Sequence, residues 1–213
     1  MSKLRLWIAM SVDGFVAGPG QDVNHPLGVG GVQLHDWVFP LAAWRKLQGL
    51  PGGEVNKSTA EIEASTANIG STIMGRNMFG GGPGPWSDNP WNGWWGENPP
   101  YHHPVFVLTH HPRERMVCKG GTTFTFVTDG IESALDQART AAAGMDVSLA
   151  GGAATAREYL TANLVDEMEI NLVPVFLGDG ERLFDQLGVG HPRFTHVRTV
   201  AAPGVTHLTF RRA

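Results

Sequence analysis

The chain has 213 residues, of which 42% are hydrophobic and 17% are charged, and its formal net charge is -4. This balance predicts one folded domain over residues 1–213, and it disfavours both a disordered chain and a protein with a basic face for nucleic acid. The single cysteine, Cys118, excludes an intrachain disulfide and a multi-cysteine metal site, which favours a reduced, cytoplasmic setting.

Short apolar segments alternate with amphipathic ones along the chain, which predicts an α/β protein. The apolar segment 4–10 is too short to span a membrane, so we expect a buried first strand there. Strands are expected at 4–10, 72–75, 105–109, 124–128, 147–150 and 168–177. Helices are expected at 36–47, 59–68, 131–143 and 153–162. The alternation predicts a three-layer α/β/α fold around a mostly parallel sheet.

Local signals refine this outline at three places. Pro40 should break or start the first helix, and the spacing of Asp129 and Glu132 is that of a capping box at the start of the third. At the end of the chain, segments 194–201 and 206–211 flank a Pro-Gly pair, so we expect them to close the sheet as an antiparallel hairpin.

The segment 80–104 has neither a helical nor a strand period. It holds four of the seven tryptophans, Trp86, Trp91, Trp94 and Trp95. A structureless loop of this length is usually functional. It should fold back over a ligand pocket, where the indoles could stack on a flat ring, or over a neighbouring subunit in a homodimer. Its adjacent histidines, His102 and His103, lack further ligands at suitable spacing, so we expect no metal site.

The stretch "SLAGGAATAREYL" at 148–160 places two glycines between an expected strand and an expected helix. Such a turn allows a helix to pack closely on a sheet. It equally allows an anion to approach the unpaired N–H groups at the helix start. The stretch alone leaves both interpretations open.

Four segments in chain order resemble one known family. They are "MSVDGFVAG" (10–18), "TIMGRNMFGG" (72–81), "VFVLTHHP" (105–112) and the long segment 147–184. They resemble the reductase domain of the bifunctional riboflavin-biosynthesis deaminase-reductases and its stand-alone relatives, which share the dihydrofolate reductase fold. The resemblance implies NADPH bound at the carboxyl ends of the strands and reduction of a small ring compound. The deaminase half is absent, because its zinc site would need several cysteines.

The resemblance also implies the residues that contact the cofactor. Arg76 would bind the adenosine phosphates, Thr109 and the histidines after it the 2′-phosphate, and the Gly151–Gly152 turn the pyrophosphate. The full cofactor set is Ala9, Gly18, Gly75, Arg76, Thr109, His110, Gly151, Gly152, Ala153 and Ala154. No acidic residue stands at the turns after 75 and 109, where NAD-selecting sites commonly place one, so NADPH is expected over NADH.

Two carboxylates are the catalytic candidates, Asp13 and Glu167. The resemblance implies that Asp13 lies in the substrate pocket and that the strand of Glu167 lies beside it, so we expect the two close together at the substrate end of the cleft. The alternative for Asp13 is a simple Asp-Gly turn. In a strand, Glu167, Glu169 and Asn171 share one face, and the alternative for this trio is a solvated stripe. Because Glu167 adjoins an apolar segment, we assign it to the site and expect Glu169 at the surface.

The expected function is NADPH-dependent reduction of a C=N or C=O group in a small heterocycle, such as a pteridine or an aminopyrimidine. The alternative is a nucleotide- or flavin-binding module without turnover, because fold does not fix function. No nucleic-acid, membrane or metal partner is expected, and a homodimer is plausible.

Overall fold

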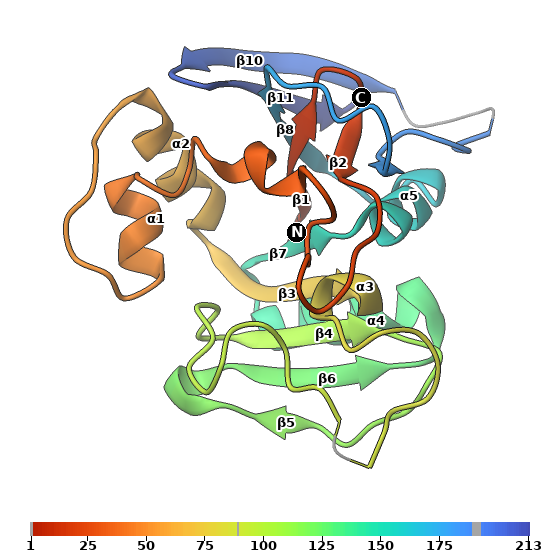
Figure 1. The fold of residues 1–213 in the computed structure, drawn as a ribbon. Helices are drawn as coiled ribbons and strands as arrows, with labels where there is room; N and C mark the ends of the chain where they lie inside the picture. The colour runs from red at the N-terminus through yellow and green to blue at the C-terminus, as the bar shows by residue number, and fades with distance from the viewer. Residues whose placement is uncertain (1, 89, 189–192) are drawn as a thin grey trace.

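The computed structural model describes residues 2–88, 90–188 and 193–213. A nine-stranded sheet of order β10-β11-β8-β1-β7-β3-β4-β6-β5 runs through the molecule (Figure 1). Its strands are β1 (Leu4–Ser11), β3 (Ile69–Gly75), β4 (Pro104–Leu108), β5 (Met116–Val117), β6 (Thr123–Val127), β7 (Asp146–Gly151), β8 (Glu167–Val173), β10 (Phe194–Ala202) and β11 (Val205–Arg212). A second, two-stranded sheet joins β2 (Phe15–Ala17) to β9 (Glu181–Arg182).

The strand directions confirm the predicted topology. Strands β8, β1, β7, β3, β4 and β6 are parallel to one another, whereas β10 and β11 form an antiparallel hairpin. The helices are α1 (Ala42–Leu47), α2 (Lys57–Thr66), α3 (Arg76–Phe79), α4 (Gly130–Ala142) and α5 (Ala153–Thr161), with 3-10 turns η1 (Gly31–His35) and η2 (Lys119–Gly121). Parallel neighbours connected through helices are the pattern that alternating strands and helices predict.

One face of the sheet is covered by α4 and α5. Leu4, Leu6 and Ile8 of β1 point to this face and pack in one cluster with Ala138 of α4 and Tyr159 of α5. These side chains are buried, so this layer forms the largest core of the molecule.

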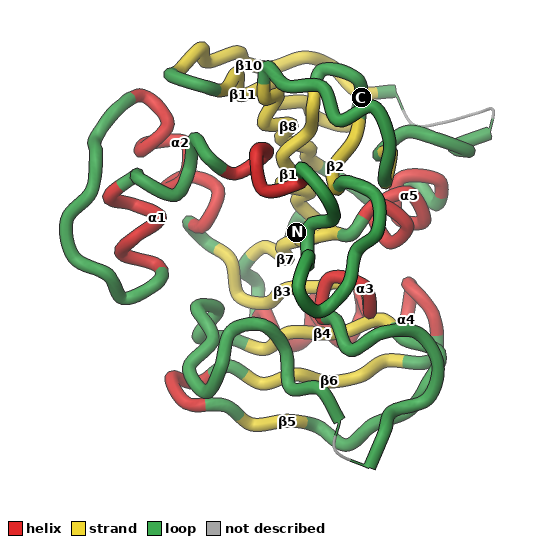
Figure 2. Tube along the Cα trace, viewed as in Figure 1, coloured by secondary structure: helices red, strands yellow, loops and turns green. Residues whose placement is uncertain are grey.

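The opposite face is covered by two separate units. The helical cover consists of η1, α1, α2 and the segment between η1 and α1. Leu34 of η1, with Trp37 and Leu41 of that segment, packs in one cluster with Ala9 and Val173 of the sheet. The tryptophan loop, residues 80–104, forms the other cover. In Figure 1 it passes in front of β4 and β6, with α4 behind them, and Figure 2 shows it as a long path without strand or helix. It therefore folds back on the sheet of its own chain, and the choice between the rim of a ligand pocket and a subunit contact stays a prediction.

Hydrophobic packing explains why a segment without periodicity is fixed in place. Trp86, Trp91 and Trp95 pack against the cluster that contains Phe79 and Phe124. The indole N–H of Trp86 donates to the carbonyl of His111 at 3.0 Å, and that of Trp91 donates to the carbonyl of Phe79 at 2.9 Å. Trp86 and Trp91 thus pack an apolar ring on this cluster and satisfy their polar N–H groups.

Three local expectations are wrong in detail. The helix expected at 36–47 begins only at Ala42, after Pro40. Strand β8 ends at Val173 rather than at 177, because Pro174 cannot donate to the sheet. The Asp129 side chain makes no capping bond to α4; a capping box stands instead at α2, where Asn56 caps the helix.

Within residues 2–88, 90–188 and 193–213, no helix is both long enough and apolar enough to cross a membrane.

Candidate active site

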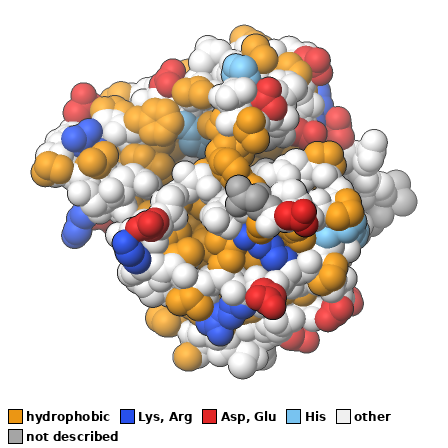
Figure 3. Space-filling model, turned by 60° about the horizontal axis from the view of Figure 1, so that its bottom comes forward, with side chains coloured by type: hydrophobic (Ala, Val, Ile, Leu, Met, Phe, Trp, Pro, Cys, Tyr) orange, Lys and Arg blue, Asp and Glu red, His pale blue; other side chains and the backbone are white. Residues whose placement is uncertain are grey.

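A cavity of about 1170 Å³ lies between the helical cover and the tryptophan loop. Its floor is the uncovered middle of the sheet, where the register places Trp7, Ser148 and Thr72 on one face of neighbouring strands. In Figure 3, hydrophobic side chains gather in the middle of the face shown, with Lys or Arg atoms beside them. The space between the two covers therefore opens onto the middle of the sheet.

The carboxyl ends of the parallel strands open into one end of this cavity, as expected for an α/β fold. Most of the predicted cofactor residues lie there, at the ends of β3, β4 and β7 and on the turns after them, whereas Ala9 lies within β1 on the floor beside this end. Those that line the cavity are Ala9, Gly75, Arg76, Thr109, His110, Gly152, Ala153 and Ala154. We call this end the cofactor end. Gly18 and Gly151 are the two members of the predicted set that do not line the cavity.

The glycines near this end have different structural roles. A Cβ at Gly75 would lie 2.2 Å from the hydroxyl oxygen of Thr155, so Gly75 permits the first turn of α5 to approach β3. A Cβ at Gly152 would meet no atom within 4 Å. A Cβ at Gly18 would lie 2.0 Å from the carbonyl oxygen of Val29, so Gly18 serves packing within its own loop. Only Gly152 leaves space that another molecule could fill.

Helix α5 begins directly at this open turn. Its N-cap is Gly152, which has no side chain to cap the first N–H groups. Ala153 and Ala154, the first two residues of the helix, line the cavity. Unpaired N–H groups and the positive end of the helix dipole favour a negatively charged group here.

Arg76 is held tightly, yet it keeps one donor free. Its Nε donates to the carbonyl of Gly80 at 3.1 Å, and its Nη2 donates to the carbonyl of Gly81 at 3.3 Å. The guanidinium stacks on Trp86, 3.2 Å from the ring centroid. The buried Nη1 has no hydrogen-bond partner among the described residues. A buried cationic donor without a partner is costly unless a ligand supplies an acceptor.

A second arginine lies close by but has another role. Arg113 lies over the same Trp86 ring at 4.7 Å, and its approach contributes, after partial burial, to a lowered pKa of Arg76. Its Nη1 donates to the carbonyl of Trp91 at 2.5 Å and its Nη2 to the side-chain oxygen of Asn92 at 2.6 Å. Arg113 does not line the cavity. It anchors the tryptophan loop, a role that no sequence motif signals.

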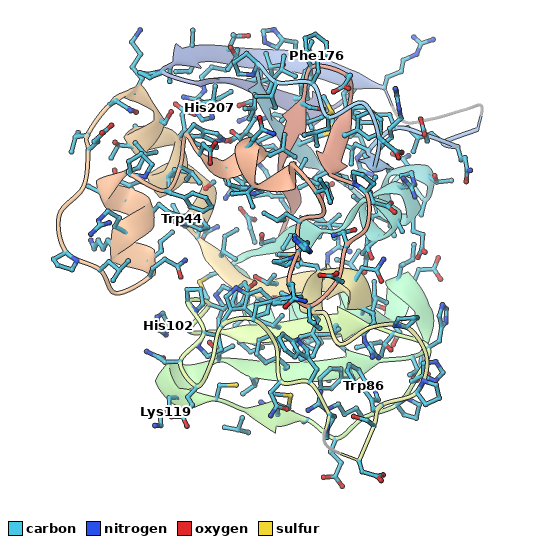
Figure 4. All side chains as sticks on the ribbon, in the orientation of Figure 1. Trp44, Trp86, His102, Lys119, Phe176 and His207 are labelled. Carbon is cyan, nitrogen blue, oxygen red and sulfur yellow. The ribbon has the colours of Figure 1, made fainter. Side chains whose placement is uncertain are left out.

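The other end of the cavity lies between α1 and α2 on one side and the tryptophan loop on the other. We call it the ring slot. Figure 4 labels Trp44 beside α1 and His102 below it, at the left end of β4. The lining residues are Trp7, Trp44, Leu47, Gln48, Ile62, Ser65, Thr66, Gly70, Thr72, Met78, Trp94, Trp95, Tyr101, His102, His103 and Ser148.

The two carboxylates predicted to act together are far apart. Glu167 pairs in register with Arg5 at the start of the parallel strands β8 and β1, whereas Asp13 follows the opposite end of β1. Strands rise about 3.3 Å per residue, so the length of β1 separates them. The prediction that they are neighbours is wrong, because parallel strands bring together residues at the same end only.

Each of these carboxylates has a partner of its own outside the cavity lining. Asp13 accepts from the backbone N–H groups of Leu177 at 3.2 Å and Gly178 at 2.8 Å. A hydrogen bond from the Ser11 side chain, and then these two backbone bonds, lower its pKa. Glu167 forms ion pairs with Arg211 at 3.0 Å and Arg5 at 3.6 Å. Asp13 therefore anchors the loop after β8, and Glu167 ties together the amino-terminal edge of the sheet.

The carboxyl that lies nearer the ring slot is Glu169, which was expected at the surface. Glu169 is buried, and it accepts from the indole N–H of Trp7 at 2.9 Å. Burial, followed by repulsion from Glu61, raises the pKa of Glu169 to about 7. The neighbouring His207 ring lies 3.9 Å away and is held by Ser58 at 2.9 Å. Figure 4 shows His207 beneath the hairpin strands, and burial lowers its pKa to about 4.

In the described part of the chain, no three His, Cys, Asp or Glu side chains gather in a way that could hold a metal ion.

Comparison with known proteins places this architecture in a family. A family model described as the RibD C-terminal domain matches residues 2–208. Among curated protein sequences, nothing matches.

Solved structures share the fold. A putative riboflavin biosynthesis protein from Shewanella sp. PV-4 is 22% identical with a TM-score of 0.64, and the match covers 99% of each chain. Dihydrofolate reductase from Enterococcus faecalis, complexed with NADP(H), is 13% identical with a TM-score of 0.51, covering 99% of this chain and 96% of that one.

A longer protein matches through part of its length. It is the diaminohydroxyphosphoribosylaminopyrimidine deaminase/5-amino-6-(5-phosphoribosylamino)uracil reductase from Thermotoga maritima, with 11% identity and a TM-score of 0.57. The match covers all of this chain and 57% of that one. At these identities the likeness shows the dihydrofolate reductase-like fold.

Proposed function

Because the chain belongs to the RibD C-terminal domain family, we propose that it is an NADPH-dependent reductase acting on a C=N or C=O group of a small heterocycle. One observation carries the proposal. Arg76, whose buried Nη1 has no partner among the described residues, and the open turn at Gly152 line the same cavity, at the carboxyl ends of parallel strands. A free cationic donor and a bare helix start are two separate sites for the phosphate groups of one nucleotide.

The residues present fit this cofactor. Gly152, Ala153 and Ala154 would hold the pyrophosphate, and Arg76 with Thr109 and His110 would hold the phosphate of the adenosine end. Ala9, on the floor between the two ends of the cavity, would contact the nicotinamide. NADPH supplies the hydride when it is bound. The two acids in the cavity lining, Glu158 and Glu181, lie on α5 and β9 rather than on the turns after β3 and β4.

The protein's contribution to the reaction is placement. Hydride transfer needs its donor and acceptor atoms within roughly 3 to 3.5 Å, so the floor and both covers must hold the acceptor ring beside the cofactor end. Since neither Asp13 nor Glu167 lines the cavity, we propose that water admitted to the cavity delivers the proton, and that Asp13 acts by anchoring its loop.

Calorimetry with NADPH and NADH tests cofactor binding, and we expect NADPH to bind more tightly. Turnover is then followed by the loss of absorbance of the reduced nicotinamide, with a panel of pteridines, ribityl-substituted aminopyrimidines and aldehydes. Failure to bind NADPH would contradict the proposal. Binding without turnover on any member of the panel would instead favour a nucleotide-binding module.

A further inference from the structure

The charged groups of the cavity are unevenly distributed. Among the described lining residues, Arg76 is the one Lys or Arg, and it lies at the cofactor end. The two carboxylates of the lining, Glu158 and Glu181, come from α5 and β9. The ring slot, as its lining was given above, contains no carboxylate, lysine or arginine among the described residues.

The polar groups that the slot offers are mostly amide and hydroxyl groups. They are the amide of Gln48, the hydroxyls of Ser65, Thr66, Thr72, Ser148 and Tyr101, and the rings of His102 and His103. The Nε2 of His103 lies 2.7 Å from the Thr72 hydroxyl oxygen. Burial, with a smaller contribution from His102, lowers the pKa of His103 to about 4, so its ring is uncharged near pH 7.

The charges nearest to the slot reinforce this neutrality. Arg5 lies beside the floor, two residues before Trp7 on β1, but its guanidinium donates to the carbonyls of Ala67 at 3.1 Å and Ala64 at 3.0 Å and forms the ion pair with Glu167. Glu169 lies beside Trp7 on the neighbouring strand β8 and adds negative charge as it ionises. A phosphate on the floor of the slot would meet no lysine or arginine among the lining residues given above, and it would be repelled by Glu169.

The walls of the slot are aromatic on several sides. Trp7, Trp44, Trp94, Trp95 and Tyr101 line it, and they come from the floor, the helical cover and the loop. The indole N–H of Trp7 is satisfied by Glu169, and that of Trp94 donates to the carbonyl of Met78 at 3.0 Å. With their N–H groups already bonded, these two rings offer apolar surface, which suits a flat, aromatic molecule.

We infer that the ring slot selects an uncharged, planar heteroaromatic compound that carries no phosphate group. This inference rests on the proposed function, because it assigns Arg76 to the cofactor. The neutral amide and hydroxyl groups of the slot pair with ring N–H and C=O groups, and the indoles cover the ring faces. A phosphorylated form of the same ring would have to bury a dianion without a partner.

Matched pairs of compounds test this selection. The probes are 5-amino-6-ribitylaminouracil and 6-hydroxymethylpterin, each beside its own phosphate monoester, titrated calorimetrically into the whole chain with and without saturating NADP⁺. We expect the unphosphorylated member of at least one pair to bind about tenfold or more tightly than its ester. Equal or tighter binding of the esters would overturn the inference.

Two substitutions locate the effect in the slot. Trp44→Ala should weaken ring binding about tenfold and leave NADPH affinity unchanged. Phe39→Ala, which changes an exposed ring outside the cavity, is its control. Gln48→Lys should strengthen binding of the esters about tenfold by supplying the missing cation. The control Gln33→Lys, on η1 and outside the lining, should not.

The outcomes separate this inference from the proposed function. If NADPH binds but no ring compound of either pair does, the selection is wrong and the cofactor proposal stands. If NADPH fails to bind while the unphosphorylated rings still bind through Trp44, the proposed function is wrong and the slot's preference stands. An ester preference in the unchanged protein contradicts the slot assignment whatever the cofactor result.

Discussion

Replacing Arg76 by alanine is the sharpest test of the cofactor end. The guanidinium already uses its Nε and Nη2 on the carbonyls of Gly80 and Gly81, so it has one free nitrogen, Nη1, to offer a phosphate. Arg76→Ala should therefore remove one charge-assisted contact from NADPH. NADH lacks the 2′-phosphate, so its affinity should fall much less if Nη1 binds that group.

The expected magnitude follows from that single contact. A hydrogen bond to a charged group contributes about 1.5 to 3 kcal/mol, which corresponds to a loss of roughly ten- to a hundredfold in NADPH affinity. Arg76 also stacks on Trp86, so its removal could disturb the tryptophan loop. Arg113→Ala controls for this, because Arg113 also lies over Trp86 and anchors the loop but does not line the cavity.

Isothermal calorimetry with both cofactors distinguishes the interpretations. A loss for NADPH that Arg113→Ala does not reproduce supports a direct contact with the phosphate. Equal losses for NADPH and NADH would remove Arg76 from the 2′-phosphate site, and equal effects of the two substitutions would reduce both arginines to anchors of the loop.

Three further predictions follow from the geometry. Gly152→Val should retain the fold and lose NADPH binding, because the valine side chain would fill the open turn. Gly75→Ala should lower the free energy of unfolding by about 1 to 3 kcal/mol, because the alanine Cβ would collide with Thr155 of α5. Thermal melts and calorimetry check this pair, and a destabilised Gly152→Val would count against the open turn. Glu169 has its pKa raised from 4.5 to about 7, so the stability that the protonated carboxyl contributes is present below pH 4.5 and lost as the pH rises through 7. Relative to Glu169→Gln, the unchanged protein should lose up to about 3 kcal/mol of its free energy of unfolding between pH 4.5 and pH 7, as urea titrations measure it. A difference in unfolding free energy between the two proteins that does not change with pH would refute the shift. Asp13→Asn and Glu167→Gln should each keep kcat within about threefold, since neither lines the cavity; a fall of 10² to 10⁴ would restore a general acid.

The sheet and its helical layer could be read from the sequence because their signals are local. Continuous apolar segments predicted buried strands, and the Pro-Gly pair predicted the hairpin that β10 and β11 form. The motifs at strand ends predicted residues that line one end of the cavity, because parallel strands bring their carboxyl ends to one edge of the sheet. The positions at which the strands end therefore suffice to bring these residues together, and their contact with a cofactor stays a prediction.

The ring slot could not be predicted in the same way, because it depends on contacts between distant segments. Trp44 lines it from α1, a helix whose start was misplaced, and Trp94 lines it from a loop without any period. The anchor of that loop, Arg113, bonds to residues about twenty positions earlier in the chain. Such pairings carry no signal in one sequence, so the loop's closeness to the sheet became visible only in the fold.

The exchange of roles between Glu167 and Glu169 shows the physical limit of reasoning from alternation. Both side chains point to the same face of β8, as the period of two requires. What differs is the cover above each position: Glu167 lies at the end of the strand, beside Arg5 and Arg211, whereas Glu169 lies one step further in, beneath α2 and Trp7. Alternation assigns a face, but the residues packed on that face decide which carboxyl is buried. The inner position therefore carries the raised pKa, and it places an ionisable group beside Trp7, at the edge of the floor of the ring slot.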